Sequence, residues 1–148
     1  MERSNMMKIA RLGIKQYKEL KRLSELKDFP FKINRRTVLK TCHGKAFQRM
    51  CKSNTIHNKI EQMYGCFDGD SLVGVVCAKF EFVSPVGSNE PMHRWGWNCE
   101  LTGAYTVLGY RKHGICTALT SAVKDDAQTI GANIFCPILA DDKECFLY

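Results

Sequence analysis

The chain has 148 residues, of which 45% are hydrophobic and 25% are charged, and its formal net charge at pH 7 is +7. These values exclude an intrinsically disordered chain and predict one domain, residues 1–148, with a hydrophobic core of its own. Because no apolar run approaches the ~20 residues that cross a bilayer, and the N-terminus lacks the apolar segment of a signal peptide, we expect a cytoplasmic protein that does not enter a membrane.

The charge is distributed unevenly along the chain. Residues 1–60 contain 16 Lys or Arg and 4 Asp or Glu, a net charge of +12, whereas residues 61–148 contain 6 and 11, a net charge of −5. The basic residues of the first part form either an ordinary solvated helix face or a surface that attracts an acidic partner. A nucleic acid, an acidic protein or an anionic cofactor would each satisfy the second interpretation.

A short strand and two helices are predicted in the N-terminal part. The strand is expected at residues 8–11, and a helix at residues 14–26, where an apolar residue recurs every third position on one face. Residues 28–30 break this pattern. A second helix is expected to start near residue 37, and the basic segment that reaches residue 58 ends it.

The middle of the chain predicts a β-hairpin. Its strands are expected at residues 61–67 and 72–83, because the Asp-Gly-Asp sequence between them is typical of a tight turn. Residues 84–94 contain two prolines and a glycine, which predicts a loop. Trp95 and Trp97 follow this loop. They could line an acceptor site or a partner surface, but paired aromatic residues at a strand entry more often pack into the core.

Residues 98–118 predict a strand that runs into a basic turn and then into a helix. The turn has the sequence RKHG at residues 111–114. A helix N-terminus offers backbone N–H groups and the positive end of the helix dipole, and a glycine lets an anion approach the main chain. The pattern therefore predicts a phosphate-binding turn; the alternative is an ordinary connection with solvated basic side chains. The helix is expected to end near residue 131, before a parallel strand at residues 134–139.

Residues 107–119 resemble the acyl-CoA signature of the GNAT superfamily of N-acyltransferases. In that signature Arg or Gln is followed, at the fourth place, by Gly and, at the sixth, by Gly or Ala. Arg111 and Gly114 fill the first and fourth places, and Cys116 departs from the pattern at the sixth. The predicted hairpin also resembles the central hairpin of the family, and Glu100 has the spacing of the general base in histone-acetyltransferase-like members.

The resemblance extends from about Met63 to Tyr148. Near the C-terminus the family shows Asn, Ala, Leu and Tyr. Leu147 and Tyr148 agree with this pattern, whereas Asp141 and Glu144 do not.

As the resemblance implies, the fold is mixed α/β (α+β), with a mostly antiparallel central sheet that is flanked by helices and splayed at the signature strand. The pantetheine arm of acetyl-CoA would enter this opening and pair with the backbone at residues 106–108. The pyrophosphate would lie over the N–H groups of residues 112–116. The candidate cofactor-binding residues are Thr106, Val107, Leu108, Arg111, Lys112, His113, Gly114, Ile115, Cys116 and Thr117.

The resemblance also assigns catalytic roles. Acyl transfer needs a neutral amine nitrogen, and Glu100 is the candidate that accepts its proton; an exposed strand carboxylate is the alternative interpretation. On a regular strand Glu100 shares a face with Thr102, Ala104 and Thr106, but a bulge near Gly103 would change this parity.

Tyr148 is the candidate acid that protonates the leaving CoA thiolate. It is the last residue of the sequence, whereas relatives continue through a further strand. We therefore expect an open sheet edge, which a second copy of the chain could cover in a homodimer.

Eight cysteines include no CxxC pair, and Cys42, His43 and His57 come nearest to a metal cluster. We expect reduced structural thiols and no metal.

Three functions are compatible with these patterns. The first is an N-acyltransferase that transfers an acetyl group from acetyl-CoA to an amine acceptor that the sequence does not identify. The second is a member of the same fold that has lost catalysis and acts as a binding or assembly protein through the basic surface of its N-terminal half. The third is an acyltransferase for nucleic acid, or for a protein bound to it, and salt-sensitive binding to DNA or RNA would separate it from the first.

Overall fold

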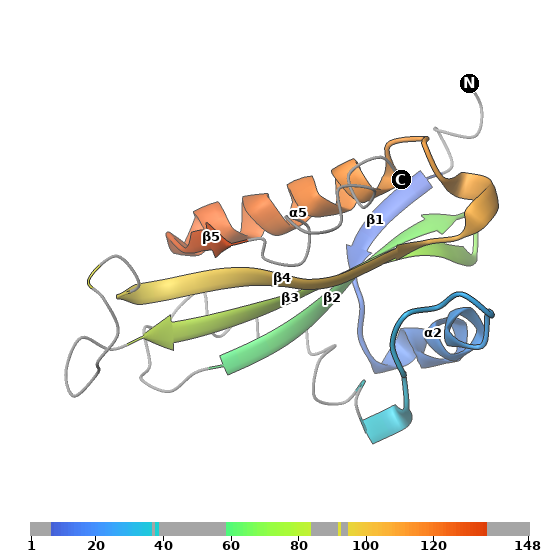
Figure 1. Ribbon diagram of the computed structural model, residues 1–148, viewed down its shortest axis with the longest axis horizontal. Helices are drawn as coiled ribbons and strands as arrows, with labels where there is room; N and C mark the ends of the chain where they lie inside the picture. The colour runs from blue at the N-terminus through green and yellow to red at the C-terminus, as the bar shows by residue number, and fades with distance from the viewer. Residues whose placement is uncertain (1–6, 37, 39–58, 84–91, 93–94, 136–148) are drawn as a thin grey trace.

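The computed structural model describes residues 7–36, 38, 59–83, 92 and 95–135 (Figure 1). Its centre is one five-stranded sheet in which the strands lie side by side in chain order. All neighbouring strands are antiparallel except the last pair, which is parallel. The strands are β1 (Met7–Arg11), β2 (Lys59–Asp68), β3 (Ser71–Val83), β4 (Gly96–Thr106) and β5 (Asn133–Phe135).

The long helix α5 (Ile115–Ile130) covers one face of the sheet, and the short helix α2 (Tyr17–Ser24) lies on the other (Figure 1). This arrangement confirms the predicted mixed α/β class with a mostly antiparallel sheet. No helix of the described residues is long and apolar enough to span a bilayer.

The first predicted helix is shorter than its apolar pattern suggested. Residues 14–16 form the 3-10 helix η1 (Ile14–Gln16), and the α-helical part begins at Tyr17 and ends at Ser24. Leu20 and Leu23 of this helix are fully buried. The second predicted helix starts before residue 37, where it was expected, since the Val38 N–H donates to the Asn34 carbonyl at 3.0 Å. Its continuation through residues 39–58 lies outside the described residues.

The hairpin of β2 and β3 is confirmed, with Gly69 and Asp70 as its two-residue turn. Gly69 has a φ of 62°, a left-handed conformation that glycine adopts without the steric cost that a Cβ would add. This turn lies at the same end of the sheet as the connection from β4 to α5, since Asp68 accepts a hydrogen bond from Tyr110 at 2.6 Å.

Strand β4 contains a bulge, as the sequence had allowed. Cys77 of β3 pairs with Gly103, and the next residue, Ala78, pairs with Leu101, so Thr102 is the extra residue of β4. Residues on either side of the bulge therefore change faces. The regular-strand expectation for Glu100 is wrong in this respect: Ala104 and Thr106 lie on the opposite face from Glu100.

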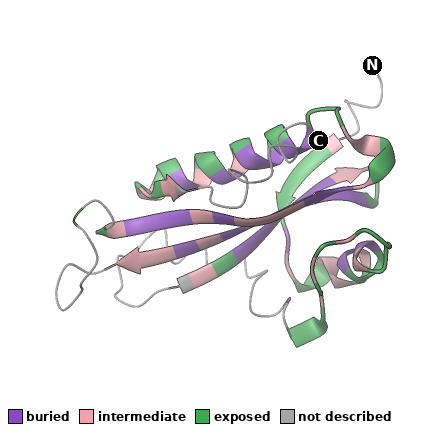
Figure 2. Ribbon diagram, viewed as in Figure 1, coloured by how far each residue is buried: buried purple, intermediate pink, exposed green. Residues whose placement is uncertain are grey.

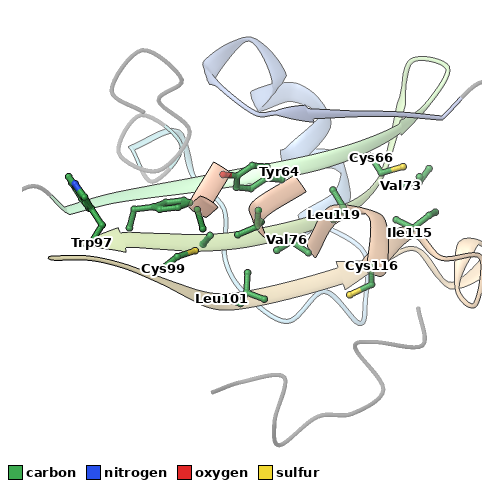
Figure 3. Packing of buried hydrophobic residues seen from close by; sticks show 14 residues of the cluster. Tyr64, Cys66, Val73, Val76, Trp97, Cys99, Leu101, Ile115, Cys116 and Leu119 are labelled. Atoms are coloured by element: carbon green, nitrogen blue, oxygen red, sulfur yellow. The ribbon is translucent and has the colours of Figure 1, made fainter. Parts of the chain in front are cut away.

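Two apolar clusters hold the layers together. The larger one lies between the sheet and α5, both of which carry buried residues (Figure 2), and it includes Tyr64, Val76, Trp97 and Leu119 (Figure 3). The smaller one lies between the sheet and α2 and is built around Leu20, Leu23, Met63 and Val75. Strand β3 contributes to both clusters because its alternate residues face opposite sides.

Trp97 and three cysteines pack into the larger of these clusters. Trp97 is 4% exposed and packs edge-on against Phe82 at 5.4 Å between ring centroids, which confirms the packing interpretation for this residue. Cys66, Cys99 and Cys116 are buried in the core, and none of these three cysteines forms a disulfide. Within the described residues, no three His, Cys, Asp or Glu side chains gather into a metal site. The Cys42, His43 and His57 set lies outside those residues.

The C-terminal strand is confirmed as far as it is described. Residues 133–135 of β5 pair in parallel with residues 98–100 of β4. The continuation to residue 139, the predicted splay between these strands and the predicted open edge lie beyond the described residues. The same holds for Asp141, Glu144, Leu147 and Tyr148.

Candidate functional site

The connection between β4 and α5 consists of the short 3-10 helix η3 (Leu108–Tyr110) and the basic turn that follows it. Lys112 and Gly114 adopt left-handed φ angles of 64° and 81°. The ladder of α5 begins with the Ala118 N–H, which donates to the Gly114 carbonyl at 2.9 Å. The first N–H groups of a helix have no carbonyl partner in a preceding turn of that helix. A Cβ built on Gly114 meets no atom within 4 Å. An anion can therefore reach the backbone here and benefit from the helix dipole.

Side chains from two distant segments anchor this turn. The Tyr110 hydroxyl donates to Asp68 of the β2–β3 hairpin at 2.6 Å. Arg111 donates through Nε to the Thr106 carbonyl at 2.8 Å and through Nη2 to Asp28 Oδ2 at 2.7 Å. The turn is thus fixed to the hairpin on one side and to the segment after α2 on the other, which preorganises it for a ligand.

Asp28 stands at the centre of a small polar cluster. Its Oδ1 accepts a hydrogen bond from the Tyr105 hydroxyl at 2.6 Å, while Arg111 lies over the Tyr105 ring at 5.6 Å from the centroid. The hydrogen bond from Tyr105 and the Arg111 guanidinium lower the pKa of Asp28. Burial, together with the negative charge of Asp28, raises the pKa of Tyr105 to about 12. At neutral pH the cluster therefore consists of a carboxylate, a protonated phenol and a guanidinium.

The predicted cofactor residues between Lys112 and Thr117 differ in how exposed their side chains are. Lys112, His113 and Thr117 are exposed around the turn, where they can meet a ligand. Ile115 and Cys116 are buried in the larger cluster, so they can offer a ligand only their backbone.

The end of β4 already has several internal partners. The Thr106 carbonyl accepts from Arg111, the Val107 N–H donates to the Val73 carbonyl at 2.9 Å, and the Val107 carbonyl accepts from Tyr110 at 2.8 Å. Leu108 is 71% exposed beyond them. Pairing of the pantetheine arm with residues 106–108 stays a prediction, and at the Thr106 carbonyl it would compete with Arg111.

Glu100 lies on the face of the sheet that α2 covers. It is 33% exposed and forms an ion pair with Lys79 of β3 at 3.2 Å between Oε1 and Nζ. Glu61 of β2 lies next to Lys79 in the same cross-strand row. Glu100 therefore belongs to a partly solvated row of alternating charges. Tyr148, the second predicted catalytic residue, lies outside the described residues.

A cavity of about 220 Å³ opens beside the β4 bulge. Its walls come from the sheet on one side and from the segment after α2 on the other. They are mainly apolar, although Glu61 and Lys32 contribute charge. The residues that line it are Phe31, Lys32, Ile33, Glu61, Gln62, Met63, Cys77, Ala78, Thr102 and Gly103.

Sequence reasoning missed the residues that join this cavity to the turn. Asp28 was interpreted only as part of a helix-breaking segment, and Tyr105 only as a strand residue. The signal for Phe31 was weak, since an aromatic residue after a Pro fits a loop as well as a cavity wall. These roles depend on contacts between residues as much as 83 positions apart, such as Asp28 and Arg111.

No family model matches the sequence, and no curated protein is significantly similar to it. Solved structures do match. A ribosomal-protein-alanine N-acetyltransferase from Brucella melitensis biovar Abortus 2308 is 18% identical, with a TM-score of 0.56, over 92% of this chain and 84% of that one. NAA60 from Arabidopsis thaliana in complex with acetyl-CoA is 15% identical, with a TM-score of 0.60, over 88% of this chain and 75% of that one.

A third structure is AAC(6')-Iy in complex with a bisubstrate analog, CoA-S-monomethyl-acetylneamine. It is 13% identical, with a TM-score of 0.58, over 93% of this chain and 85% of that one. At these identities the similarities establish the fold. The chain has the GNAT fold of acetyltransferases.

Proposed function

We propose that this protein is an N-acetyltransferase that transfers the acetyl group of acetyl-CoA to an amine. The observation that carries the proposal is the left-handed basic turn between β4 and α5, anchored at Asp68 and Asp28, within a fold shared with proteins solved with acetyl-CoA or a CoA analog. Neither feature alone would be sufficient, because a fold hosts several functions and helix N-termini are common.

The turn suits a pyrophosphate for two reasons. Its backbone N–H groups at residues 112–116 and the dipole of α5 favour negative charge, and the space around Gly114 admits the ligand. Lys112 and His113 add exposed basic side chains beside it. Because the anchors hold the turn without a ligand, little ordering entropy is lost on binding.

The cavity beside the bulge is the proposed site of the acceptor amine. It lies against β4, and its charged lining residue Glu61 belongs to the same row as Glu100. Bringing the amine and the thioester together at the end of β4 would convert a bimolecular reaction into an effectively unimolecular one.

In the proposed reaction the amine nitrogen attacks the thioester carbonyl carbon with its lone pair. Glu100 accepts the proton that this nitrogen must lose, directly or through a water molecule. A backbone N–H of β4 stabilises the oxyanion of the tetrahedral intermediate. When the C–S bond breaks, the CoA thiolate takes a proton, for which Tyr148 is the proposed donor.

Isothermal titration of the reduced protein with CoA and with acetyl-CoA tests the proposed cofactor site. Reducing conditions exclude a mixed disulfide between CoA and a cysteine. We expect micromolar binding that Gly114→Glu weakens by at least about fivefold and that Gly131→Glu, at the other end of α5, leaves intact. A wild-type protein that binds neither ligand would exclude the proposed activity.

Release of free CoA thiol, followed with an amine panel of polyamines and basic peptides, tests catalysis. The comparison of Glu100→Gln with Glu81→Gln is informative, because Glu81 of β3 lies on the same face without a proposed role. We expect turnover to fall in the first variant and persist in the second. Equal turnover in both would remove Glu100 from the mechanism.

The charge of residues 1–60 supports an alternative function, a binding protein that recognises nucleic acid or an acidic protein. In the described part, Lys15, Lys18 and Lys27 are exposed around α2. Binding to DNA or RNA that weakens steeply as salt rises, in a protein that does not bind CoA, would favour this alternative.

A further inference from the structure

Asp28 joins the two proposed ligand sites. It receives hydrogen bonds from Tyr105 at 2.6 Å and from Arg111 at 2.7 Å, one on each carboxylate oxygen. Tyr105 belongs to β4, and Arg111 is the first residue of the basic turn. One carboxylate therefore bridges the end of the sheet and the cofactor turn.

The segment that carries Asp28 also forms a wall of the cavity. Phe29 packs against Phe31 at 4.5 Å between centroids and against Tyr105 at 4.9 Å. Phe31 lines the cavity and lies over Gly103, where an added Cβ would be 3.2 Å from Phe31 Cε1. A shift of Asp28 would thus move Phe29 and, through it, the ring that closes the cavity.

We infer that Asp28, Tyr105 and Arg111 form a link through which acyl-CoA bound at the turn and amine bound in the cavity influence each other. In this link the three residues are positioning residues, since they act through the Phe31 wall and the turn. The inference rests on the proposed function for the identity of its two ligands.

The geometry gives a reason for the coupling. Arg111 shares its guanidinium between Asp28 and the Thr106 carbonyl. CoA phosphates at the turn attract the same cation, and the pantetheine arm is expected at the same carbonyl. Either contact changes the hydrogen bond that Arg111 donates to Asp28. Thermodynamic coupling between two sites is reciprocal. If bound CoA changes the affinity for the amine by some factor, an amine that displaces Phe31 changes the affinity for CoA by that same factor.

A simple anchor would behave differently. It would hold residues 28–33 in place, and its loss would lower stability, but CoA at the turn would leave that segment unchanged. The Phe29 N–H donates to the Leu26 carbonyl at 3.1 Å within the segment, so its hydrogen exchange reports the local opening directly.

Hydrogen exchange of residues 25–34 tests the link, first without ligand. The variants are Asp28→Asn, Tyr105→Phe and Arg111→Lys, and the matched control is Glu25→Gln. Glu25 forms an exposed ion pair with Lys21 at 3.3 Å in the same region without contacting the turn. We expect several-fold faster exchange at Phe29 in the three variants and wild-type exchange in the control.

The second arm adds CoA at saturating concentration. We expect CoA to change the exchange rate at Phe29 in the wild type, and Asp28→Asn to remove this change at a CoA concentration that saturates the variant despite a weaker affinity. Tyr105→Phe keeps the aromatic contacts, so it provides the same test if Asp28→Asn does not fold.

The outcomes separate the inference from the proposed function. Exchange at wild-type rates in Arg111→Lys and Asp28→Asn overturns the link, whether or not CoA binds. A CoA effect on Phe29 that survives in Asp28→Asn also overturns it. If the wild type binds no CoA, the proposed function fails, and faster ligand-free exchange in the variants then shows only that Asp28 anchors residues 28–33. A wild type that binds CoA without any change at Phe29 overturns the link and leaves the proposed function standing.

Discussion

Glycines 114 and 131 mark the two ends of α5 and offer a matched pair of substitutions. Both have left-handed backbones, with φ angles of 81° and 70°, and an added Cβ meets nothing within 4 Å at either position. Substitution therefore causes strain without a clash. For a residue with a Cβ this strain is about 1–2 kcal/mol. At roughly 3 °C per kcal/mol for a chain of this size, Gly114→Ala and Gly131→Ala should each lower Tm by about 3–6 °C.

Acidic substitutions at the same positions should separate in CoA binding. A carboxylate at residue 114, placed about 4 Å from a phosphate charge, would cost about 1 kcal/mol in bulk water and about 4 kcal/mol at an effective dielectric of 20. This range corresponds to roughly a fivefold to a thousandfold loss of affinity. At residue 131 the same charge lies at the opposite end of the helix and should leave CoA affinity unchanged.

Thermal melts and CoA titrations of the four variants measure both quantities. We expect similar Tm losses within the alanine pair, and loss of CoA affinity for Gly114→Glu alone. Undiminished CoA affinity in Gly114→Glu would refute the assignment of the phosphate site to this turn. Equal loss of affinity in both glutamate variants would show that the effect comes from destabilised α5 and not from local charge.

Three further predictions follow from the polar network and the packing. Tyrosinate absorbance during alkaline titration should show one phenol titrating near pH 12 that Tyr105→Phe removes; because this folded-state pKa is raised, its contribution to stability is complete below about pH 10 and is lost as pH rises through about 12. Asp126→Asn breaks the 2.8 Å ion pair with Arg11. Because Arg11 is 37% exposed, the contribution of this pair is discounted, and we expect the free energy of unfolding in urea to fall by about 1–2 kcal/mol. Glu25→Gln, which breaks an exposed ion pair, should cause no measurable loss. Gly74→Ala places a Cβ 2.8 Å from Ile115 Cγ2, so it should cost about 1–3 kcal/mol alone and less than that in an Ile115→Ala background; strict additivity would contradict this packing.

Local patterns were sufficient for most of the sheet and for α5. The turn at Gly69 and the apolar period of α5 are encoded within a few residues, so hairpin and helix were predictable. The pattern of residues 14–26 was misleading at both ends, and at its start the reason is local. Its first turn tightened into a 3-10 helix in which the Gly13 N–H donates to the Gln16 side chain at 2.6 Å.

The candidate site was predictable only where it is contiguous in sequence. The basic turn was visible because its glycine, its charges and the helix start fall within a few positions. The partners that fix it, Asp68 and Asp28, come from other segments, and nothing in their neighbourhoods indicates a contact with residues 110 and 111. Pairing of side chains across the fold depends on tertiary geometry, which a single sequence does not encode in any local signal.

The bulge at Thr102 explains how one strand can serve both proposed sites. Before the bulge, Glu100 faces the α2 side of the sheet, in the row that reaches the cavity. After the bulge, Tyr105 faces the same side and donates a hydrogen bond to Asp28, whereas Thr106 faces α5 and leads into the turn. Without the extra residue, positions 103–106 would exchange faces relative to Glu100. Tyr105 would then point toward α5 and lose Asp28, and Thr106 would enter the face occupied by α2. The register of β4, more than any single side chain, therefore keeps the proposed base, the cavity wall and the cofactor turn on the sides of the sheet where they can work together.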